Sequence, residues 1–240
     1  MIRRTAWLAG AAALIYLLWL PWVPSLKHSI PEPTAIMERR VSQAGKKGLK
    51  LNQKMVWRNL SRISPSLVKA VLLAEDDVFY GHRGFDLDQI KIALKLNWRK
   101  KRYAYGGSTI TQQLARTLYL SPTKSILRKA KEAVIAFWME SVLSKRRILE
   151  IYLNVVEWGP GVYGAEAASR YYYQKGAEEI SEEEAVALAS ILPSPRRWSP
   201  LKESPFMKRR RDDLRSRLRG DKPQAQKSGD DAVGAGELAP

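Results

Sequence analysis

The sequence predicts a mainly α-helical protein with one transmembrane helix at its N-terminus. Three observations support this fold class. Serine and proline capping signals precede apolar runs with helical spacing. No run of alternating β-branched residues predicts a strand, and an uncharged, mostly apolar stretch lies close to the start of the chain. With 240 residues and 45% hydrophobic content, the chain can bury one sizeable core, which can divide into two lobes.

The N-terminal stretch is interpreted as a membrane anchor. Arg3 and Arg4 precede the apolar run 5–25, and roughly 20 apolar residues suffice to cross a bilayer as a helix. A positively charged flank stays cytoplasmic, so residues 1–4 are expected there and the bulk of the chain on the opposite side. A cleaved signal peptide is the alternative. Its small residues usually follow the apolar core, whereas here they come first, at positions 9–13, and this order favours an uncleaved anchor.

The remaining chain divides into three parts. Residues 26–60 are polar and interrupted by proline and glycine, so they are expected to form a juxtamembrane connector. Residues 61–218 contain the predicted helices and are expected to be the catalytic domain. Residues 219–240 have no periodic apolar face and are predicted to be a disordered tail.

Eight helices are expected in the central part, each with a recognisable start. The expected ranges are 64–75, 86–97, 108–120, 121–142, 144–153, 163–173, 181–192 and 205–218. The expected start signals are Ser64 with Pro65, Asp86 with Gln89, Ser108, Ser121 with Pro122, Ser144, the break Gly159-Pro160-Gly161, Ser181 with Glu184, and Pro205.

A cluster of carboxylates, Glu75, Asp76 and Asp77, stands at the end of the first of these helices. A solvated helix end is one interpretation, although the helix dipole disfavours negative charge there. Apolar neighbours and adjacent carboxylates would raise the pKa of Glu75, which suits a general base. His82 has no sequence partner for a catalytic triad and is expected to bond a loop carbonyl. Phe79 is expected to pack the loop.

A second polar cluster, 106–113, begins with two glycines that permit a close backbone approach. Ser108 and Thr109 are expected to present helix N-terminal amides to an anion. Gln112 and Gln113 are neutral amides suited to hydrogen bonds with sugar or peptide. An ordinary capped helix with exposed glutamines is the alternative. The cluster is not a nucleotide-binding loop, because no Gly-Lys-Ser/Thr follows the glycines.

The composition indicates an anionic partner, because 41 basic and 24 acidic residues give a formal charge of +17. Nucleic acid, anionic lipid and a phosphorylated substrate all qualify. The basic loop 99–102, Arg116 and Arg128 are expected to converge on a diphosphate near the base. Arg128 and Glu132 have i, i+4 spacing, which predicts a surface ion pair worth only about 0.3–0.5 kcal/mol. The chain has no cysteine and two histidines, so disulfides and a multi-histidine metal site are not expected.

Five ordered motifs resemble those of the family 51 glycosyltransferases, the peptidoglycan glycosyltransferases. The matching stretches are 75–86, 106–114, Arg128 with Lys131, Glu132 and Glu140, Lys145 with 148–150 and 152–154, and 161–173. The resemblance covers about Ser64 to Pro200, with the motifs in order. One departure is Arg116-Thr117, where the family usually has Lys-Asn. Arginine keeps the cation, but its bidentate fork alters how a phosphate is held.

The resemblance implies a lysozyme-like, two-lobed fold and an enzyme that polymerises lipid II, a disaccharide-pentapeptide on undecaprenyl diphosphate. The growing chain would pass with inversion to the acceptor GlcNAc 4-hydroxyl. Glu75 would be the base, and Glu132 a second acidic residue near the leaving group or a metal. The residues expected to bind substrate and organise the cleft are Asp76, Phe79, His82, Thr109, Gln112, Gln113, Arg116, Arg128 and Lys131.

The residue inventory agrees with a transferase, because a diphosphate leaves without protonation if cations neutralise its charge. The expected partners are lipid II, the nascent glycan strand, the membrane and other cell-wall synthesis proteins, and not nucleic acid. No organic cofactor is expected, and a divalent metal, Mg²⁺ or Mn²⁺, is left open. The expected location is the bacterial inner membrane, with one span and a periplasmic catalytic domain. Two alternatives remain: a lysozyme-like glycan-cleaving enzyme, and a non-enzymatic basic membrane protein that binds anionic lipid or nucleic acid.

Overall fold

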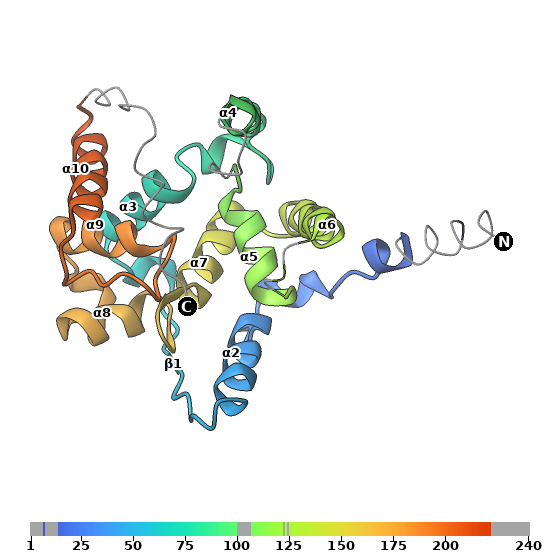
Figure 1. Ribbon diagram of the computed structural model, residues 1–240, viewed down its shortest axis with the longest axis horizontal. Helices are drawn as coiled ribbons and strands as arrows, with labels where there is room; N and C mark the ends of the chain where they lie inside the picture. Colours follow the sequence, from blue (N-terminus) through green and yellow to red (C-terminus); the bar gives the residue numbers. More distant parts are fainter. Residues whose placement is uncertain (1–6, 8–13, 100–106, 122, 124, 222–240) are drawn as a thin grey trace.

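The computed structural model describes residues 7, 14–99, 107–121, 123 and 125–221, which are mainly helical (Figure 1). The α-helices are α2 (Ala35–Gly45), α3 (Pro65–Glu75), α4 (Leu87–Arg99), α5 (Ile110–Tyr119), α6 (Ile126–Val142), α7 (Lys145–Val155), α8 (Ala165–Tyr173), α9 (Glu182–Ile191) and α10 (Pro205–Arg219). Short 3-10 helices are η1 (Val23–Lys27), η2 (Leu60–Arg62), η3 (Phe79–Gly81) and η4 (Ala177–Glu179). The predicted helical class is therefore confirmed.

The core is built around α3, α5, α7 and α9. Helix α3 lies against α9, and α10 covers both, while α5 lies between α6 and α7 (Figure 1). Among the largest wholly buried side chains are Trp158, Tyr152, Leu67, Leu114 and Met139. This arrangement brings the C-terminal end of α3 next to the N-terminal end of α5, where the two polar clusters of the sequence meet.

Most predicted helix starts are confirmed. Helix α3 begins at Pro65 and ends at Glu75, α7 follows its cap Ser144, and α9 has the predicted capping box of Ser181 and Glu184. The cap of α3 works differently from the expectation. The hydroxyl of Ser64 makes no bond to its own helix and instead donates to the carbonyl of Ile180, which joins α3 to the segment before α9.

The predicted starts of α5 and α6 are wrong. Helix α5 is capped by Thr109 instead of Ser108, because Thr109 and Gln112 form a reciprocal capping box. Helix α6 begins at Ile126 after the cap Ser125, four residues later than expected. The hydroxyl of Ser121, expected to cap α6, accepts a hydrogen bond from Arg39 on α2 instead.

The structure contains a small sheet that the sequence did not predict. Strands β1 (Lys54–Met55), β2 (Glu157–Gly159) and β3 (Val162–Tyr163) lie in the order β1-β3-β2. Strand β3 pairs in parallel with β1 and antiparallel with β2. Strands of two or three residues are too short to show the alternation that marks a strand in a sequence. The helix expected from Tyr163 therefore begins only at Ala165, after β3.

Glycine is required between β3 and α8. Gly164 has a φ of +82°, and a Cβ at this position would lie 2.4 Å from the carbonyl oxygen of Asn154. Asn154 is wholly buried and exchanges hydrogen bonds with both the backbone N–H and the carbonyl of Arg58. The close approach at Gly164 thus fixes α8 against the end of α7.

The segment before α3 is more structured than the expected connector. Val23 and Leu26 of η1 belong to the buried core, and α2 lies against α5. Within the described ranges, no helix is both long and apolar enough to span a bilayer. The part of the predicted anchor before Leu14 lies outside the described residues, except for Trp7. The predicted disordered tail beyond Asp221 also lies outside them.

Candidate active site

Glu75 is the last residue of α3, and its side chain is only 12% exposed. Its Oε2 accepts a hydrogen bond from Gln113 Nε2 at 2.9 Å. The Oε1 of Gln113 accepts one from the hydroxyl of the buried Tyr152 at 3.2 Å. The Oε1 of Glu75 is shielded from solvent and makes no hydrogen bond with the described residues. The carboxylate is therefore held from one side and only partly satisfied.

The surroundings of Glu75 favour its protonated form. Burial raises the pKa of Glu75 above its ordinary value. The hydrogen bond from Gln113 and the charges of Arg210 and Arg116 oppose this rise, while Asp76 adds to it. The predicted raised pKa is confirmed, although the main cause is burial and the neighbouring carboxylate contributes less.

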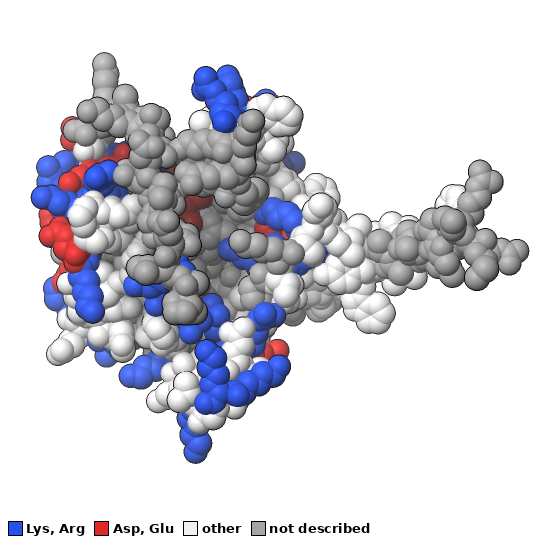
Figure 2. All heavy atoms as spheres, viewed as in Figure 1, with Lys and Arg blue, Asp and Glu red and all other residues white. Residues whose placement is uncertain are grey.

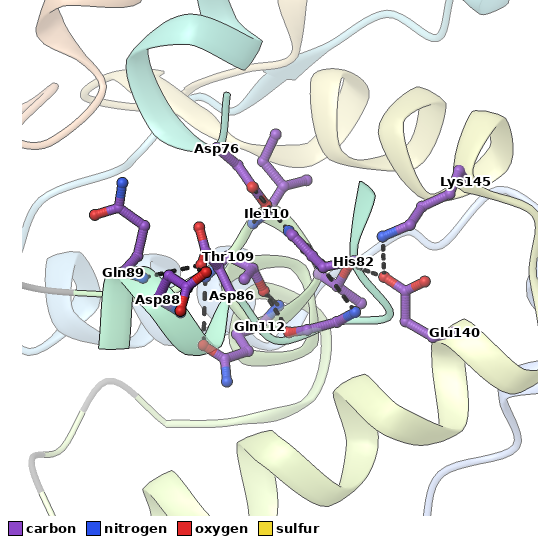
Figure 3. Close-up of polar contacts among 12 residues, drawn as sticks. Asp76, His82, Asp86, Asp88, Gln89, Thr109, Ile110, Gln112, Glu140 and Lys145 are labelled. Carbon is purple, nitrogen blue, oxygen red and sulfur yellow. Dashed lines mark hydrogen bonds and ion pairs between the residues drawn. The ribbon is translucent and has the colours of Figure 1, made fainter. Parts of the chain in front are cut away.

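Asp76 joins three segments of the chain (Figure 3). Its Oδ1 lies 2.8 Å from His82 Nε2, and its Oδ2 accepts the backbone N–H of Ile110 at 2.9 Å. His82 Nδ1 accepts the N–H of Gly84 at 3.1 Å, so the neutral ring carries its proton on Nε2 and donates it to Asp76. The expectation that His82 bonds a loop carbonyl is wrong, because its partner is a carboxylate.

The polar groups at the N-terminus of α5 make hydrogen bonds within the protein. Asp76 accepts the amide of Ile110, and the hydroxyl of Thr109 donates to the carbonyl of Gly84 at 2.7 Å. The buried Gln112 side chain accepts the N–H of Thr109 in the capping box (Figure 3). The backbone amides that were predicted to bind a substrate anion are therefore largely hydrogen-bonded to the protein's own side chains.

The glycine before this helix also serves an internal contact. A Cβ at Gly107 would lie 3.2 Å from three backbone atoms of Gln89 and Ile90 in α4. The close approach predicted from the glycines is thus an approach of this loop to α4.

A cleft of about 200 Å³ lies where the two polar clusters meet. Its lining includes Glu75, Asp76, Asp86, Ser108 and Arg217. The cleft therefore brings together residues of the stretches 75–86 and 107–109, which are far apart in sequence.

A cationic group adjoins this cleft through Ser108. The Nζ of Lys129 lies 2.8 Å from the hydroxyl of Ser108 and 2.5 Å from Glu132 Oε1. Arg128 binds the other oxygen of Glu132 at 2.6 Å. The predicted pair of Arg128 and Glu132 is confirmed, but Glu132 is wholly buried, so it is not the surface pair expected from spacing. Removing either cation would leave one oxygen of the buried Glu132 carboxylate without its partner.

The described residues do not fit a metal ion held by the protein alone. Both oxygens of Glu132 are bound by cations. Within the described ranges, no three His, Asp or Glu side chains come close enough together to coordinate an ion. We therefore derive no step of the reaction through a metal.

Two predicted substrate-binding residues make their contacts outside the cleft. Lys131 is buried, and its Nζ donates to the carbonyl of Tyr16 at 2.7 Å and lies 4.0 Å from the centre of the Tyr16 ring. It therefore faces the N-terminal segment. Phe79 is wholly buried beneath the ammonium of Lys145, 4.2 Å from its ring centre, and packs the loop as the residue pattern predicted.

Of the other predicted cations, Arg116 is half-buried on α5, where its charge acts on Glu75. The basic loop 99–102 lies almost wholly outside the described residues, which end at Arg99 before the gap.

The structure adds three cations that the sequence interpretation missed. Lys129 is three residues before Glu132, a spacing that could have drawn attention to it. Arg210 and Arg217 lie on α10, the helix predicted over 205–218. Arg217 pairs with Asp77 at 3.0 Å, and Arg210 lies 3.7 Å from Glu75. Local spacing gives no signal for contacts across 135 or more residues.

Comparison with known proteins places this site in a family. The sequence model of the family described as Transglycosylase matches residues 42–219, which include the whole cleft. The chain belongs to the transglycosylase family. The family predicted from the five ordered motifs is thereby confirmed.

Similar proteins cover most of this transglycosylase. A biosynthetic peptidoglycan transglycosylase of Azoarcus sp. is 47% identical over 192 residues, 78% of this chain and 83% of the relative. One from Aromatoleum aromaticum is 46% identical over 188 residues, 77% and 82% of the two chains. One from Methylobacillus flagellatus is 40% identical over 228 residues, 91% and 98% of the two chains.

Proposed function

We propose that this transglycosylase polymerises lipid II into glycan strands and releases undecaprenyl diphosphate. The observation that carries the proposal is the largely buried carboxylate of Glu75, held by Gln113 in a cleft beside a cationic group. The names of its relatives, biosynthetic peptidoglycan transglycosylases, support the same activity.

In the proposed step, Glu75 accepts the proton of the acceptor GlcNAc 4-hydroxyl. The hydroxyl oxygen forms a bond to the anomeric carbon of the donor chain, and the bond from that carbon to the diphosphate oxygen breaks. Attack from the face opposite the leaving group inverts the anomeric centre. A base of raised pKa is suited to this role, because its affinity for the proton approaches what the reaction requires.

The diphosphate leaves with the electron pair of the broken bond. The nearby cations that we assign to it are Arg116, Arg128 and Lys129, with Lys129 in place of the predicted Lys131. Lys129 is 41% exposed and is bonded to Ser108 at the cleft, so it can reach an incoming phosphate. Cations placed where charge develops stabilise the transition state without donating a proton.

The remaining predicted residues position these groups. Asp76 and His82 fix the turn after α3 against the first amide of α5. Thr109 and Gln112 fix the start of α5, from which Gln113 reaches the base. We assign no direct contact with substrate to these four residues.

We also propose that the enzyme works at the bacterial inner membrane, with one N-terminal span and a periplasmic catalytic domain. The support is the uncharged stretch 5–25 behind two arginines and the long lipid of the proposed substrate. Its expected partners are lipid II and the nascent strand, together with other cell-wall synthesis proteins.

The decisive experiment is polymerisation of lipid II by Glu75→Gln. We expect turnover to fall at least about 100-fold, because a positioned general base contributes this much or more. Lipid II binding should persist, since the amide keeps the size of the side chain. Glu178→Gln, an exposed glutamate paired with Arg62, is the control and should retain activity. Cleavage of finished glycan without polymerisation, or substantial turnover by Glu75→Gln, would contradict the proposal.

A further inference from the structure

Helix α10 brings a cation to the back of the proposed base. It lies across α3 and α9 (Figure 1). Arg210, near its middle, is 27% exposed, and one terminal nitrogen of its guanidinium lies 3.7 Å from Glu75 Oε1. Its Nε donates to the carbonyl of Ser190 on α9 at 3.0 Å. The side chain is therefore fixed at one nitrogen and directed at the carboxylate with another.

The place that Arg210 occupies favours a cation for two reasons. Ser190 is the penultimate residue of α9, so its carbonyl belongs to the last turn, where acceptors have no partner within the helix. Glu75 is the last residue of α3, and the C-terminal ends of both helices carry partial negative charge. A guanidinium between two such ends and a carboxylate compensates all three.

Arg210 also faces the oxygen of Glu75 that has no other partner. Gln113 bonds Oε2, whereas Oε1 is shielded from solvent and makes no hydrogen bond among the described residues. A buried carboxylate oxygen without compensation is costly. The guanidinium lies just beyond hydrogen-bond length from that oxygen, so its charge compensates the oxygen without a hydrogen bond.

We propose that Arg210 is a positioning residue for glycan transfer. It faces Oε1 of Glu75 and keeps the carboxylate ionised, so that Oε2 can receive the acceptor proton. This inference rests on the proposed function, in which Glu75 is the base. Arg210 itself touches neither sugar nor diphosphate.

The other groups that face Glu75 cannot replace Arg210. Asp76, at the end of the same helix, raises the pKa of Glu75, and Tyr152 of α7 is a neutral phenol whose own pKa is raised by burial. Arg116 of α5 lowers the pKa of Glu75, as Arg210 does. Arg116, however, is assigned to the diphosphate when substrate is bound. Arg210 is then the cation that stays with the base during the reaction.

The test is the pH dependence of kcat for lipid II polymerisation by Arg210→Gln. Removing a cation that lowers the pKa of Glu75 must raise that pKa, so the acidic limb of the profile should move to higher pH. We expect a displacement of about 1 pH unit, the lower end of what a charge at this distance produces. On the acidic limb this is about a tenfold loss of kcat, which recovers as the pH rises.

Two further variants separate this role from a merely structural one. Arg210→Lys keeps the charge but has a compact ammonium in place of the planar fork, so its limb should move in the same direction by a smaller amount. Arg211→Gln is the matched control. Arg211 is the next residue of α10, and its guanidinium donates to the carbonyls of Pro200 and Lys202. Its substitution should lower stability without moving the acidic limb of the pH profile.

The outcomes are distinct. A limb that stays in place for Arg210→Gln, with only a lower plateau or melting temperature, overturns the inference. If Arg210→Gln does not fold, Arg210→Met, which also removes the charge, decides, and an acidic limb that stays in place again overturns the inference. Turnover by Glu75→Gln would instead overturn the proposed function, whatever Arg210 does.

Discussion

Two adjacent carboxylates, Glu75 and Asp76, have opposite surroundings. Asp76 accepts hydrogen bonds from His82 and from the first amide of α5. Glu75 has one hydrogen bond and one buried oxygen without any. Their order at the end of an apolar helix was visible in the sequence, and it was the reason for proposing Glu75 as the base. The partners were not visible, because Gln113 and Arg210 reach Glu75 from α5 and α10, and Tyr152 holds Gln113 from α7.

The raised pKa of Glu75 predicts a gain in stability when its charge is removed. A group whose pKa is higher in the folded state than in the unfolded chain stabilises the fold below its unfolded pKa. That contribution is lost as the pH rises through the folded pKa. At pH 8, Glu75→Gln should therefore melt a few degrees above the parent, and the difference should shrink towards pH 4. Calorimetry at both pH values measures it, and a lower melting temperature at pH 8 would contradict the raised pKa.

At the scale of elements, local signals predicted helices well where they had no competitor. The hydroxyls of the caps Ser144 and Ser181 each accept a backbone N–H from the first turn of their own helix. Ser108 and Ser121 have the same chemistry, but their hydroxyls bond Lys129 and Arg39 from other elements, so the helices begin later. A tertiary contact of this kind leaves no trace in the spacing of the sequence. The three short strands were missed because none is long enough to alternate.

The junction of β3 and α8 gives a prediction at this scale. Gly164→Ala should lower the free energy of unfolding by about 3 kcal/mol or more, because it combines a positive φ with a backbone clash at Asn154. Urea denaturation measures the loss. Gly45→Ala is the matched control. Apart from the backbone of its own helix, no atom of the described part of the chain lies within 4 Å of its Cβ position in α2, so the change should be neutral or stabilising by up to about 1 kcal/mol. Equal effects of the two substitutions would contradict this reading of Gly164.

At the scale of the whole molecule, the N-terminal segment is fixed to the catalytic domain. Arg147 donates to the carbonyls of Leu26 and Ser29 and lies 5.0 Å over the ring of Trp57. Lys131 binds the carbonyl of Tyr16. These contacts attach the segment that leads to the predicted anchor at points on both α6 and α7. In the proposed membrane-anchored enzyme, these contacts would restrict the distance from the membrane to the cleft, as a lipid-linked substrate requires.

Loss of this attachment should be measurable by proteolysis. In Arg147→Gln, trypsin should cleave after Lys27 about tenfold faster, because opening the segment becomes easier by about 1.4 kcal/mol when the guanidinium bonds are removed. Arg146→Gln is the control, since the neighbouring Arg146 is exposed. Equal cleavage rates in Arg147→Gln and the parent would show that the segment is held elsewhere.

The positive charge is spread over the molecule and does not by itself locate the site. Figure 2 shows Lys and Arg side chains over the region of α2 as well as elsewhere, and on the side of α9 and α10 they are interspersed with acids. The net charge of +17 predicted an anionic partner but no position for it. The cations used in the proposed reaction are few and are defined by tertiary contacts.

Asp76 has a consequence for inhibitors. A helix N-terminus is ordinarily an attractive target for the phosphonate or carboxylate of a synthetic ligand. Here Asp76 already occupies the first amide of α5 and would repel a second anion. An anionic warhead aimed at that end should gain little affinity. An anion that reaches Arg116, or that takes the place of Ser108 beside Lys129, would meet a cation instead.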